Sequence, residues 1–331
     1  MTKKRNILIF GGGGYVGTRL SEQLAAAGHR VLAFDTFWYG ANFRISPEDK
    51  NNLTILRGDI RDIERVDAAL IGIDTIIHLA CISNDPSFEL NPRLGREINF
   101  ESFRPIVLAA KNRGVQQFIY ASSSSVYGIK QEENVTEDLP LEPLTDYSKY
   151  KAMCEEILLK ETSSNFVCTV VRPATICGYS PRQRFDLAVN ILTNHAVNNG
   201  EITVFGGKQF RPNLHIEDMI DAYKHLLMQN PNKIEGEVFN VGGKNLTLNS
   251  IAEIVSQITQ IKKIKYQETD DLRSYRVDSS LIANKIGFEP TRGVDNAVKD
   301  LLQAFSKNNF EYSLSNSLYF NVKRMKELNL A

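Results

Sequence analysis

Short apolar runs alternate with longer amphipathic segments through the first half of the chain. Six of these runs are rich in isoleucine, valine, leucine and phenylalanine, and we predict that they form buried strands over residues 6–10, 30–35, 53–59, 74–80, 117–123 and 166–173. The segments between them have the amphipathic pattern of helices that cover a sheet. This alternation predicts an α/β fold with a doubly wound parallel sheet and right-handed crossovers.

The alternation becomes irregular after about residue 175. Helices are predicted in "RFDLAVNILTNHAVNNG", "NLHIEDMIDAYKHLLMQ", "NSIAEIVSQITQI" and "VDNAVKDLLQAFSKN", and strands in "EITVFGG" and "EVFNVGG". Six strands with helices between them are typical of a Rossmann dinucleotide-binding sheet. We therefore expect a Rossmann domain over residues 1–175 and a smaller C-terminal substrate-binding lobe over 176–331, with residues 213–243 packing back onto the sheet.

Composition argues against several classes of protein. The 331 residues carry 39 basic and 39 acidic side chains, without the basic excess that nucleic-acid-binding proteins usually show. No run approaches the roughly 20 apolar residues of a membrane span, and "MTKKRN" does not resemble a signal peptide. The cysteines lack metal-binding spacing, and neither His78 nor His215 has a partner for a metal, so we predict that the protein binds no metal. We also predict that the cysteines are buried free thiols and that the protein is cytoplasmic.

A glycine-rich turn follows the first predicted strand. "GGGGYVG" places Gly11, Gly14 and Gly17 at the mouth of the first helix, where glycine lets the backbone approach a pyrophosphate stabilised by the helix N-terminus. The second strand ends at Asp35, about twenty residues further on, where a carboxylate can accept hydrogen bonds from the adenosine ribose. A carboxylate there also repels a 2′-phosphate, so we expect NAD rather than NADP.

Asp59 closes the third predicted strand, in "RGDIRD", and allows two interpretations. Its carboxylate can accept a hydrogen bond from the adenine amino group. Alternatively, it can cap the N-terminus of the helix that follows.

Tyr147 and Lys151 stand four residues apart in "DYSKYKAM", a spacing that places both on one face of a helix. They follow "YASSSSVYG" at the end of the fifth strand, at the sheet edge where such folds bind ligands. A free tyrosine has a pKa near ~10, and an adjacent ammonium and a positive nicotinamide ring should both lower it. We therefore predict that Tyr147 removes a hydroxyl proton while hydride leaves the same carbon for the nicotinamide.

These motifs together resemble a known family. The glycine turn, Asp35, "HLA", Asn99, "SSSSVYG" and Y-x-x-x-K occur in the order and spacing of the extended short-chain dehydrogenase/reductases, and more narrowly of their NAD-dependent nucleotide-sugar epimerase/dehydratase branch. The resemblance covers nearly the whole chain. It implies NAD as the cofactor, a nucleotide-diphosphate sugar as the substrate and a homodimer paired through a four-helix bundle, for which "FESFRPIVLAA" and "YSKYKAMCEEILL" offer apolar stripes.

The resemblance also implies roles for single residues. The catalytic set is matched by Ser123, Tyr147 and Lys151. The cofactor contacts are matched by Gly11, Gly14, Tyr15, Val16, Gly17, Asp35, Asp59, Ile60, Leu79, Ala80, Asn99, Tyr147, Lys151 and Ala174. Asn99 corresponds to an asparagine that supports the active-site backbone, and its alternative is a polar residue at a helix start.

Substrate contacts are expected from Ser123, Thr175, Arg182, Arg184, Arg211 and Arg273. Arg211 matches the family arginine that pairs with the diphosphate of the nucleotide, since a guanidinium suits phosphate geometry. For Arg182, Arg184 and Arg273 a solvated surface arginine is the alternative. Residues 82–92 are expected to form a loop over the sugar.

The resemblance leaves the reaction open. Enzymes of this branch first oxidise a sugar hydroxyl, usually at C4, and the dehydratases carry an acidic pair directly after the catalytic serine or threonine. Ser124 and Ser125 stand there, so dehydration is disfavoured.

Thr175 and Cys177 depart from the usual epimerase pattern, and "YSPRQRFD" resembles a subgroup that includes GDP-heptose C4 dehydrogenases. We favour an epimerase, with a 4-dehydrogenase or reductase that releases or consumes a keto sugar as the alternative.

Overall fold

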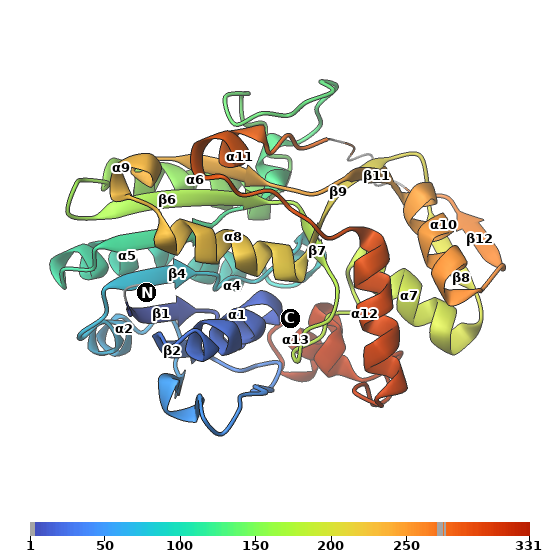
Figure 1. The fold of residues 1–331 in the computed structure, drawn as a ribbon, viewed down its shortest axis with the longest axis horizontal. Coiled ribbons are helices and arrows are strands. Elements are labelled where there is room, and N and C mark those ends of the chain that lie inside the picture. Colours follow the sequence, from blue (N-terminus) through green and yellow to red (C-terminus); the bar gives the residue numbers. More distant parts are fainter. Residues whose placement is uncertain (1–3, 270–273, 275) are drawn as a thin grey trace.

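The computed structural model describes residues 4–269, 274 and 276–331. Its centre is a seven-stranded parallel sheet in the order β10-β6-β5-β4-β1-β2-β3 (Figure 1). The strands are β1 (Asn6–Phe10), β2 (Arg30–Asp35), β3 (Leu53–Arg57), β4 (Thr75–His78), β5 (Gln117–Ala121), β6 (Val167–Pro173) and β10 (Val238–Val241). The predicted Rossmann sheet is confirmed. Its strand order reverses between β1 and β4, which is where such sheets bind ligands.

Three of the six strands expected in the first half end earlier than predicted. The strands expected over 53–59, 74–80 and 117–123 each end two residues early, as β3, β4 and β5. Among the residues just beyond these ends, Leu79 and Ser123 line the cavity described below. The prediction was too long there because an apolar run does not show where strand pairing stops.

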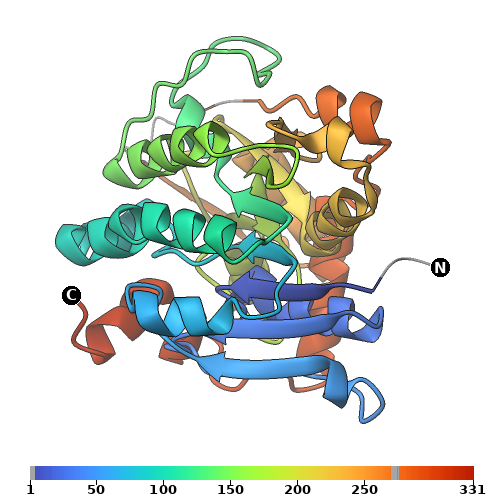
Figure 2. The same cartoon turned by 90° about the vertical axis from the view of Figure 1, so that its left-hand side faces the viewer.

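Side chains that alternate along the strands fill two cores, one on each face of the sheet. Ile7 and Ile9 of β1 belong to one core and Leu8 and Phe10 to the other, and all four are fully buried. The first face is covered by α1 (Tyr15–Ala26) and α8 (Ile216–Met228), and the second by α2 (Ile63–Ala69), α5 (Phe103–Asn112) and α6 (Asp146–Lys160) (Figure 2).

A smaller lobe lies at the far end of the molecule from β10 and β6 (Figure 1). Around its separate apolar core pack α7 (Ala188–Asn199), α10 (Leu248–Thr259), α12 (Val294–Ser306), β8 (Ile202–Phe205) and β12 (Ile264–Gln267). A three-stranded sheet lies between this lobe and the Rossmann sheet, and it consists of β11 (Asn245–Thr247), β9 (Phe210–His215) and β7 (Thr175–Cys177). The segment between β9 and β11 returns to the main sheet, because α8 packs beside α1 and β10 pairs with β6.

The C-terminal segment folds back beside the Rossmann sheet through α13 (Figure 1). Arg324 Nε donates a hydrogen bond of 2.6 Å to Trp38 O, and Met325 is fully buried in the second core. The remaining short elements are η1 (Lys50–Asn52), α3 (Asp85–Glu89), α4 (Pro92–Arg96), η2 (Glu97–Glu101), η3 (Ser124–Tyr127), α9 (Pro231–Ile234), α11 (Ser280–Ile286), η4 (Ser317–Tyr319) and α13 (Asn321–Glu327). No helix within the described residues has the length and apolar character needed to cross a membrane.

Candidate active site

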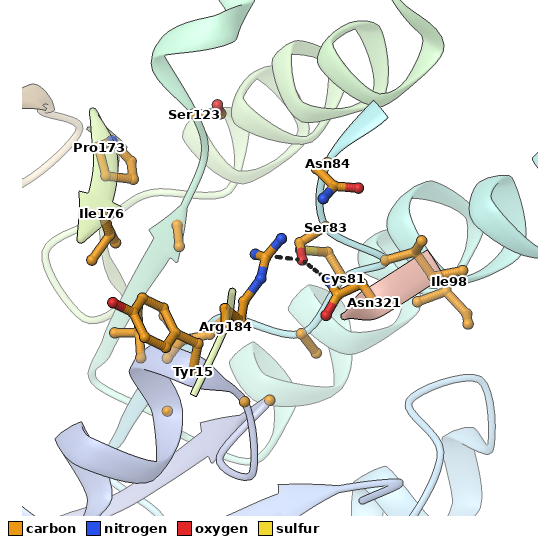
Figure 3. Close-up of a pocket in the computed structure, with 18 of the residues that line it drawn as sticks. Tyr15, Cys81, Ser83, Asn84, Ile98, Ser123, Pro173, Ile176, Arg184 and Asn321 are labelled. Carbon is orange, nitrogen blue, oxygen red and sulfur yellow. Dashed lines mark hydrogen bonds between the residues drawn. The ribbon is translucent and has the colours of Figure 1, made fainter. Parts of the chain in front are cut away.

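A cavity of about 370 Å³ lies at the carboxyl ends of the central strands (Figure 3). It brings together residues from the glycine turn, the carboxyl ends of β2, β3, β4, β5 and β6, α6 and the segment after β7. The predicted site residues that line it are Gly11, Gly14, Tyr15, Val16, Gly17, Asp35, Asp59, Ile60, Leu79, Ala80, Ser123, Tyr147, Lys151, Ala174, Thr175, Arg182 and Arg184. Asn99 and Arg211 lie outside its lining, and Arg273 lies outside the described residues.

Three glycines shape one wall of this cavity. Gly11 has a φ of +81°, a backbone angle that residues with a Cβ rarely adopt. A Cβ on Gly17 would lie only 2.0 Å from the carbonyl oxygen of Gly11. Gly14 is the N-cap of α1, and no side chain of the described residues caps this helix. The first N–H groups of a helix have no partners within it, so this turn can hold a pyrophosphate at the start of α1.

The carboxylate of Asp35 is held at the end of β2 by two backbone N–H groups. Its Oδ2 accepts a hydrogen bond from Gly13 N at 3.0 Å and its Oδ1 from Phe37 N at 2.7 Å. Burial raises the pKa of Asp35, and these two hydrogen bonds oppose the rise. The carboxylate is thus fixed beside the glycine turn, where it can accept hydrogen bonds from a ribose.

Asp59 does not cap a helix, so one of its two sequence interpretations is wrong. Asp62 caps α2 instead, since its Oδ1 accepts a hydrogen bond of 3.1 Å from Arg65 N. Asp59 pairs with Arg61 at 2.8 Å. Burial opposes ionisation of Asp59, but the hydrogen bonds from Arg61 outweigh it and hold the pKa of this carboxyl below its usual range.

Tyr147 and Lys151 lie one turn apart near the start of α6. Thr145 begins the helix, and its Oγ1 accepts a hydrogen bond of 3.3 Å from Ser148 N. Lys151 is buried, and its Nζ donates a hydrogen bond of 2.7 Å to the carbonyl of Ala121 at the end of β5. The helix cap and the strand end therefore position both side chains at the cavity.

Ser123 completes the predicted catalytic set. It follows β5 as the N-cap of η3, where its Oγ accepts a hydrogen bond of 3.1 Å from Ser125 N. Its hydroxyl also acts to lower the pKa of Tyr147. Ser123, Tyr147 and Lys151 therefore line the same cavity, as predicted.

The chain alone does not lower the pKa of Tyr147 as we expected. Burial raises this pKa well above its usual range, and the nearby Cys81 and Asp85 add to the rise. Arg184 and the hydrogen bond with Ser123 oppose it but do not outweigh burial. A phenolate at neutral pH therefore needs further positive charge, which the nicotinamide ring of NAD⁺ supplies when bound.

A buried polar network supports the turn after β5 from behind. Glu155 of α6 pairs with Arg172 of β6 at 2.7 Å, and both side chains are nearly inaccessible to water. Ser122 Oγ donates a hydrogen bond to Glu155, and Arg172 donates one of 2.8 Å to Tyr127 OH. Tyr127 in turn donates to Asn240 Oδ1 at 2.8 Å. This network fixes the turn that carries the predicted catalytic serine against α6, β6 and β10.

Asn99 holds the loop after β4 rather than lining the cavity. Its Oδ1 accepts a hydrogen bond of 2.8 Å from Ile82 N, and its Nδ2 donates one of 3.0 Å to Ile82 O. Both ends of the amide are thus used by the backbone of one residue. This geometry favours the supporting role over a direct contact with the cofactor.

The predicted site residues did not include several polar residues of the cavity, among them Tyr39, Ser83, Asp85 and Asn321. Asp85 accepts a hydrogen bond of 2.6 Å from Thr145 Oγ1. The segment expected to be a loop over the sugar pointed to Ser83 and Asp85, although α3 and α4 occupy part of it. No sequence signal marks Asn321, which reaches the cavity because α13 folds back to the sheet.

A second cavity of about 270 Å³ adjoins the first. It is lined by Thr175, Asp186, Leu187, Ala188, Phe205, Gln209, Arg211, Leu248 and Thr269. Thr175 and Leu187 line both cavities, so a ligand that spans the two passes these residues. Within the described part of the chain, no cluster of histidine, cysteine and acidic side chains is arranged to hold a metal ion.

Comparison with known proteins identifies the family. Residues 7–242 match the model of the NAD dependent epimerase/dehydratase family. The chain belongs to this family. A UDP-glucose 4-epimerase of Lactobacillus helveticus is 27% identical over 310 residues, which cover 86% of this chain and 92% of that protein. An uncharacterized UDP-glucose epimerase of Bacillus subtilis (strain 168) is 30% identical over 267 residues, which cover 77% of this chain and 81% of that protein.

The fold is shared with solved structures of related enzymes. A UDP-glucose 4-epimerase from Thermotoga maritima, solved with UDP-glucose, superposes with a TM-score of 0.80 at 25% identity and covers 92% of this chain and 99% of that chain. The cavity fits NAD: the cradle at Gly17 has no room for a Cβ, and Asp35 stands beside it. The start of α1 would hold the diphosphate and Asp35 the adenosine ribose. The protein is therefore an NAD-dependent enzyme of this epimerase/dehydratase family, as the motifs predicted.

Proposed function

We propose that this enzyme is a nucleotide-sugar epimerase that inverts a sugar hydroxyl, at C4. The observation that carries the proposal is the junction of the two cavities at Thr175, with Tyr147 in one cavity and Arg211 in the other. A sugar beside Tyr147 that is joined to a diphosphate beside Arg211 suits this arrangement, because a guanidinium binds phosphate oxygens through paired hydrogen bonds. The UDP-glucose epimerases among the relatives support the same substrate class.

The chain's own residues would carry the proton transfer. Tyr147 takes the proton of the sugar hydroxyl and later returns it, and Ser123 holds the same oxygen by a hydrogen bond. Lys151, fixed by Ala121 O, keeps a positive charge beside the phenol and contacts the nicotinamide ribose. Bound NAD would supply reversible hydride transfer at the carbon that carries this hydroxyl. Inversion requires the keto sugar to turn while its diphosphate stays in place, and an anchor in a separate cavity, Arg211, suits that motion.

A 4-dehydrogenase or reductase is the second candidate, and one observation favours it. Segment 179–186, which departs from the usual epimerase pattern, places Arg182 and Arg184 in the first cavity and Asp186 in the second. This segment therefore borders both cavities, so its departure from the epimerase pattern bears on the outcome of the reaction. Dehydration stays disfavoured, because two serines rather than carboxylates follow Ser123.

The test is to incubate the purified enzyme with UDP-, GDP-, dTDP- and CDP-hexoses and heptoses. Near-ultraviolet absorbance would follow NADH, and proton NMR would follow the sugar in the same samples. An inverted sugar without net NADH supports the epimerase, and stoichiometric NADH with a keto sugar supports the dehydrogenase. A dehydrated sugar would contradict both, and the absence of turnover with every nucleotide sugar would contradict the substrate class.

We also infer a homodimer that pairs through a four-helix bundle of α5 and α6. These helices pack against each other on one outer side of the molecule (Figure 2). Met153 of α6 is 42% exposed and Leu108 of α5 is partly exposed, and a second copy would bury both in an isologous interface. Sedimentation velocity should show a dimer that Met153→Glu weakens, whereas a monomeric wild-type protein would contradict the inference.

Two further expectations belong to this proposal. The NAD-binding domain comprises residues 1–175 together with 213–243, and the substrate-binding lobe comprises the rest of 176–331. The separate apolar core of the lobe supports this division. Free cysteines at all four positions support a location in the reducing cytoplasm.

A further inference from the structure

Two arginines after β7 are buried in the first cavity without enough partners. Arg182 is 3% exposed and Arg184 is 8% exposed. Arg182 Nη2 donates a hydrogen bond of 2.6 Å to Asn321 Oδ1, but its Nε and Nη1 have no partner among the described residues. Arg184 Nε and Nη1 donate to Asp186 Oδ1 at 2.8 Å and to Ser83 Oγ at 3.1 Å, whereas its Nη2 has no partner there.

The positive charge of this pair is incompletely compensated. Of the described residues, Asp186 alone forms an ion pair with either arginine. Burial, and then the charge of Arg184, lower the pKa of Arg182 to about 10. Buried guanidinium donors without acceptors are costly, so the site is suited to an anion that offers several oxygens to both side chains.

The two arginines lie between Asp35, predicted to bind the adenosine ribose, and Tyr147, predicted to lie at the nicotinamide. The guanidinium carbon of Arg182 lies 4.0 Å from the centre of the Tyr39 ring, on the segment that follows Asp35. Burial raises the pKa of Asp35, and the charge of Arg182 opposes this rise. Burial likewise raises the pKa of Tyr147, and there the charge of Arg184 opposes the rise. Arg182 therefore lies toward the adenosine end and Arg184 toward the nicotinamide end.

The start of α1 lies beside the pair. Figure 3 shows Arg184 pointing into the cavity above Tyr15, the first residue of α1. Two side chain–backbone hydrogen bonds join the two segments there: Tyr15 OH donates to Gly178 O at 2.6 Å and Ser180 Oγ donates to Tyr15 O at 2.7 Å. An anion at the N-terminus of α1 would thus lie in the same cavity as both guanidinium groups.

We propose that Arg182 and Arg184 form a second wall of the diphosphate site, which closes over the NAD diphosphate opposite the glycine turn and is locked by Asn321. The proposal concerns the NAD site and holds whether the enzyme is an epimerase or a dehydrogenase. It moves both arginines away from the role predicted from the sequence, contact with the nucleotide sugar. Arg211 remains for that substrate, because it lines the other cavity.

Asn321 uses three polar groups to hold this wall. Its Oδ1 accepts from Arg182, its Nδ2 donates to Ser83 Oγ at 3.0 Å, and its backbone N–H donates to Asp186 Oδ2 at 3.1 Å. Asn321 begins α13, which is tied to the loop after β2 by the hydrogen bond from Arg324 to Trp38 O. Release of NAD therefore requires α13 to move, and the enzyme should retain its cofactor over many turnovers.

The test measures cofactor exchange in the absence of substrate. Purified wild-type enzyme and the variants Arg182→Gln, Arg184→Gln and Asn321→Ala would be mixed with isotopically labelled NAD, and the bound cofactor would be analysed by mass spectrometry over time. We expect the arginine variants to exchange NAD at least about tenfold faster, as for the loss of a charge-assisted hydrogen bond. Asn321→Ala should accelerate exchange to a smaller degree, because it only loosens the wall.

Two control variants separate this proposal from the proposed function. Arg211→Gln should raise the KM for the nucleotide sugar and leave NAD exchange unchanged. Arg113→Gln, which breaks an exposed pair with Asp67 far from the cavity, should change neither quantity. If Arg211→Gln has no effect on KM, the substrate proposal fails while the exchange experiment still decides the role of the wall.

Either of two results would contradict the proposal that Arg182 and Arg184 contact the NAD diphosphate. Folded Arg182→Gln and Arg184→Gln proteins that exchange NAD as slowly as wild type would show that neither arginine contacts the diphosphate. Unchanged exchange with a raised KM would place them in the nucleotide-sugar site. Should the glutamine variants fail to fold, Arg182→Lys and Arg184→Lys keep the charge but lose the forked donors, and faster exchange is expected from them too.

Discussion

The ammonium of Lys151 lies 5.9 Å from the centre of the Tyr147 ring, one turn away on α6, and is tied to the carbonyl of Ala121. The lysine is thus held by the sheet. Tyr147 is only partly buried, but desolvation of its phenol raises its pKa. Proton transfer at Tyr147 consequently depends on positive charge from Arg184 and from the bound cofactor. This arrangement makes the chemistry dependent on cofactor binding.

Removing the hydroxyl of Tyr147 should abolish proton transfer without affecting cofactor binding. Tyr147→Phe keeps the ring but loses the general acid–base group, so turnover should fall by about 10²–10⁴-fold while bound NAD is retained. Steady-state rates and the NAD content after gel filtration would measure both. Tyr150→Phe is the matched control on the same helix, because this ring stacks on Phe100 at 5.1 Å between centroids. Normal turnover in Tyr147→Phe would refute the proposed mechanism.

Two alanine substitutions in the glycine turn should differ in their effect on stability. A Cβ on Gly17 would lie 2.0 Å from a backbone oxygen, whereas a Cβ on Gly14 would come no closer than 3.2 Å to its nearest neighbour. Gly17→Ala should therefore lower the free energy of unfolding by about 1–3 kcal/mol through overpacking, and Gly14→Ala by much less. Thermal unfolding of the NAD-free proteins is the measurement, and equal losses would contradict this account.

Removing one partner of the buried Glu155–Arg172 ion pair should destabilise the fold. Glu155→Gln leaves Arg172 buried without its carboxylate, and we expect a loss of about 3–5 kcal/mol in the free energy of unfolding. The double variant Glu155→Leu/Arg172→Met removes both charges and should recover a large part of this loss. Urea unfolding would measure both variants. A double variant no more stable than Glu155→Gln would argue against an uncompensated charge as the cause.

His78 should make the fold sensitive to acid. Its imidazole lies among Phe10, Phe103, Phe118 and Tyr120, and burial lowers its pKa to about 3. An unfolded histidine has a pKa near ~6.5, so between these values the unfolded chain binds a proton that the folded chain does not. Stability should therefore fall as the pH decreases through this window.

The variant His78→Phe tests that window. It should flatten the dependence of the free energy of unfolding on pH between about 6.5 and 4. Phe118→Leu, a change in a ring that packs on His78, should lower stability by a similar amount at every pH. An unchanged slope in His78→Phe would show that other groups cause the loss at acid pH.

Local patterns were enough to predict the sheet and much of the cavity. Glycine at 11, 14 and 17, an acid at 35 and the Tyr147–Lys151 spacing predicted residues that do line one cavity. These signals are local, because a turn, a strand end or a helix face is set by a few neighbouring residues. Asp59 shows the limit: the sequence left open whether it caps the following helix, and the structure gives that role to Asp62.

The sequence by itself determined the Rossmann sheet, the glycine turn and the helix that carries Tyr147, because each depends on periodicity or on one turn of chain. Only the tertiary structure decided that Arg182 and Arg184 enter the same cavity as Asp35, and that Asn321 meets them there. Asn321 is 139 positions from its partner Arg182. Contacts over such separations depend on how the lobe and the C-terminal segment pack on the sheet, and no local pattern of residues encodes that packing.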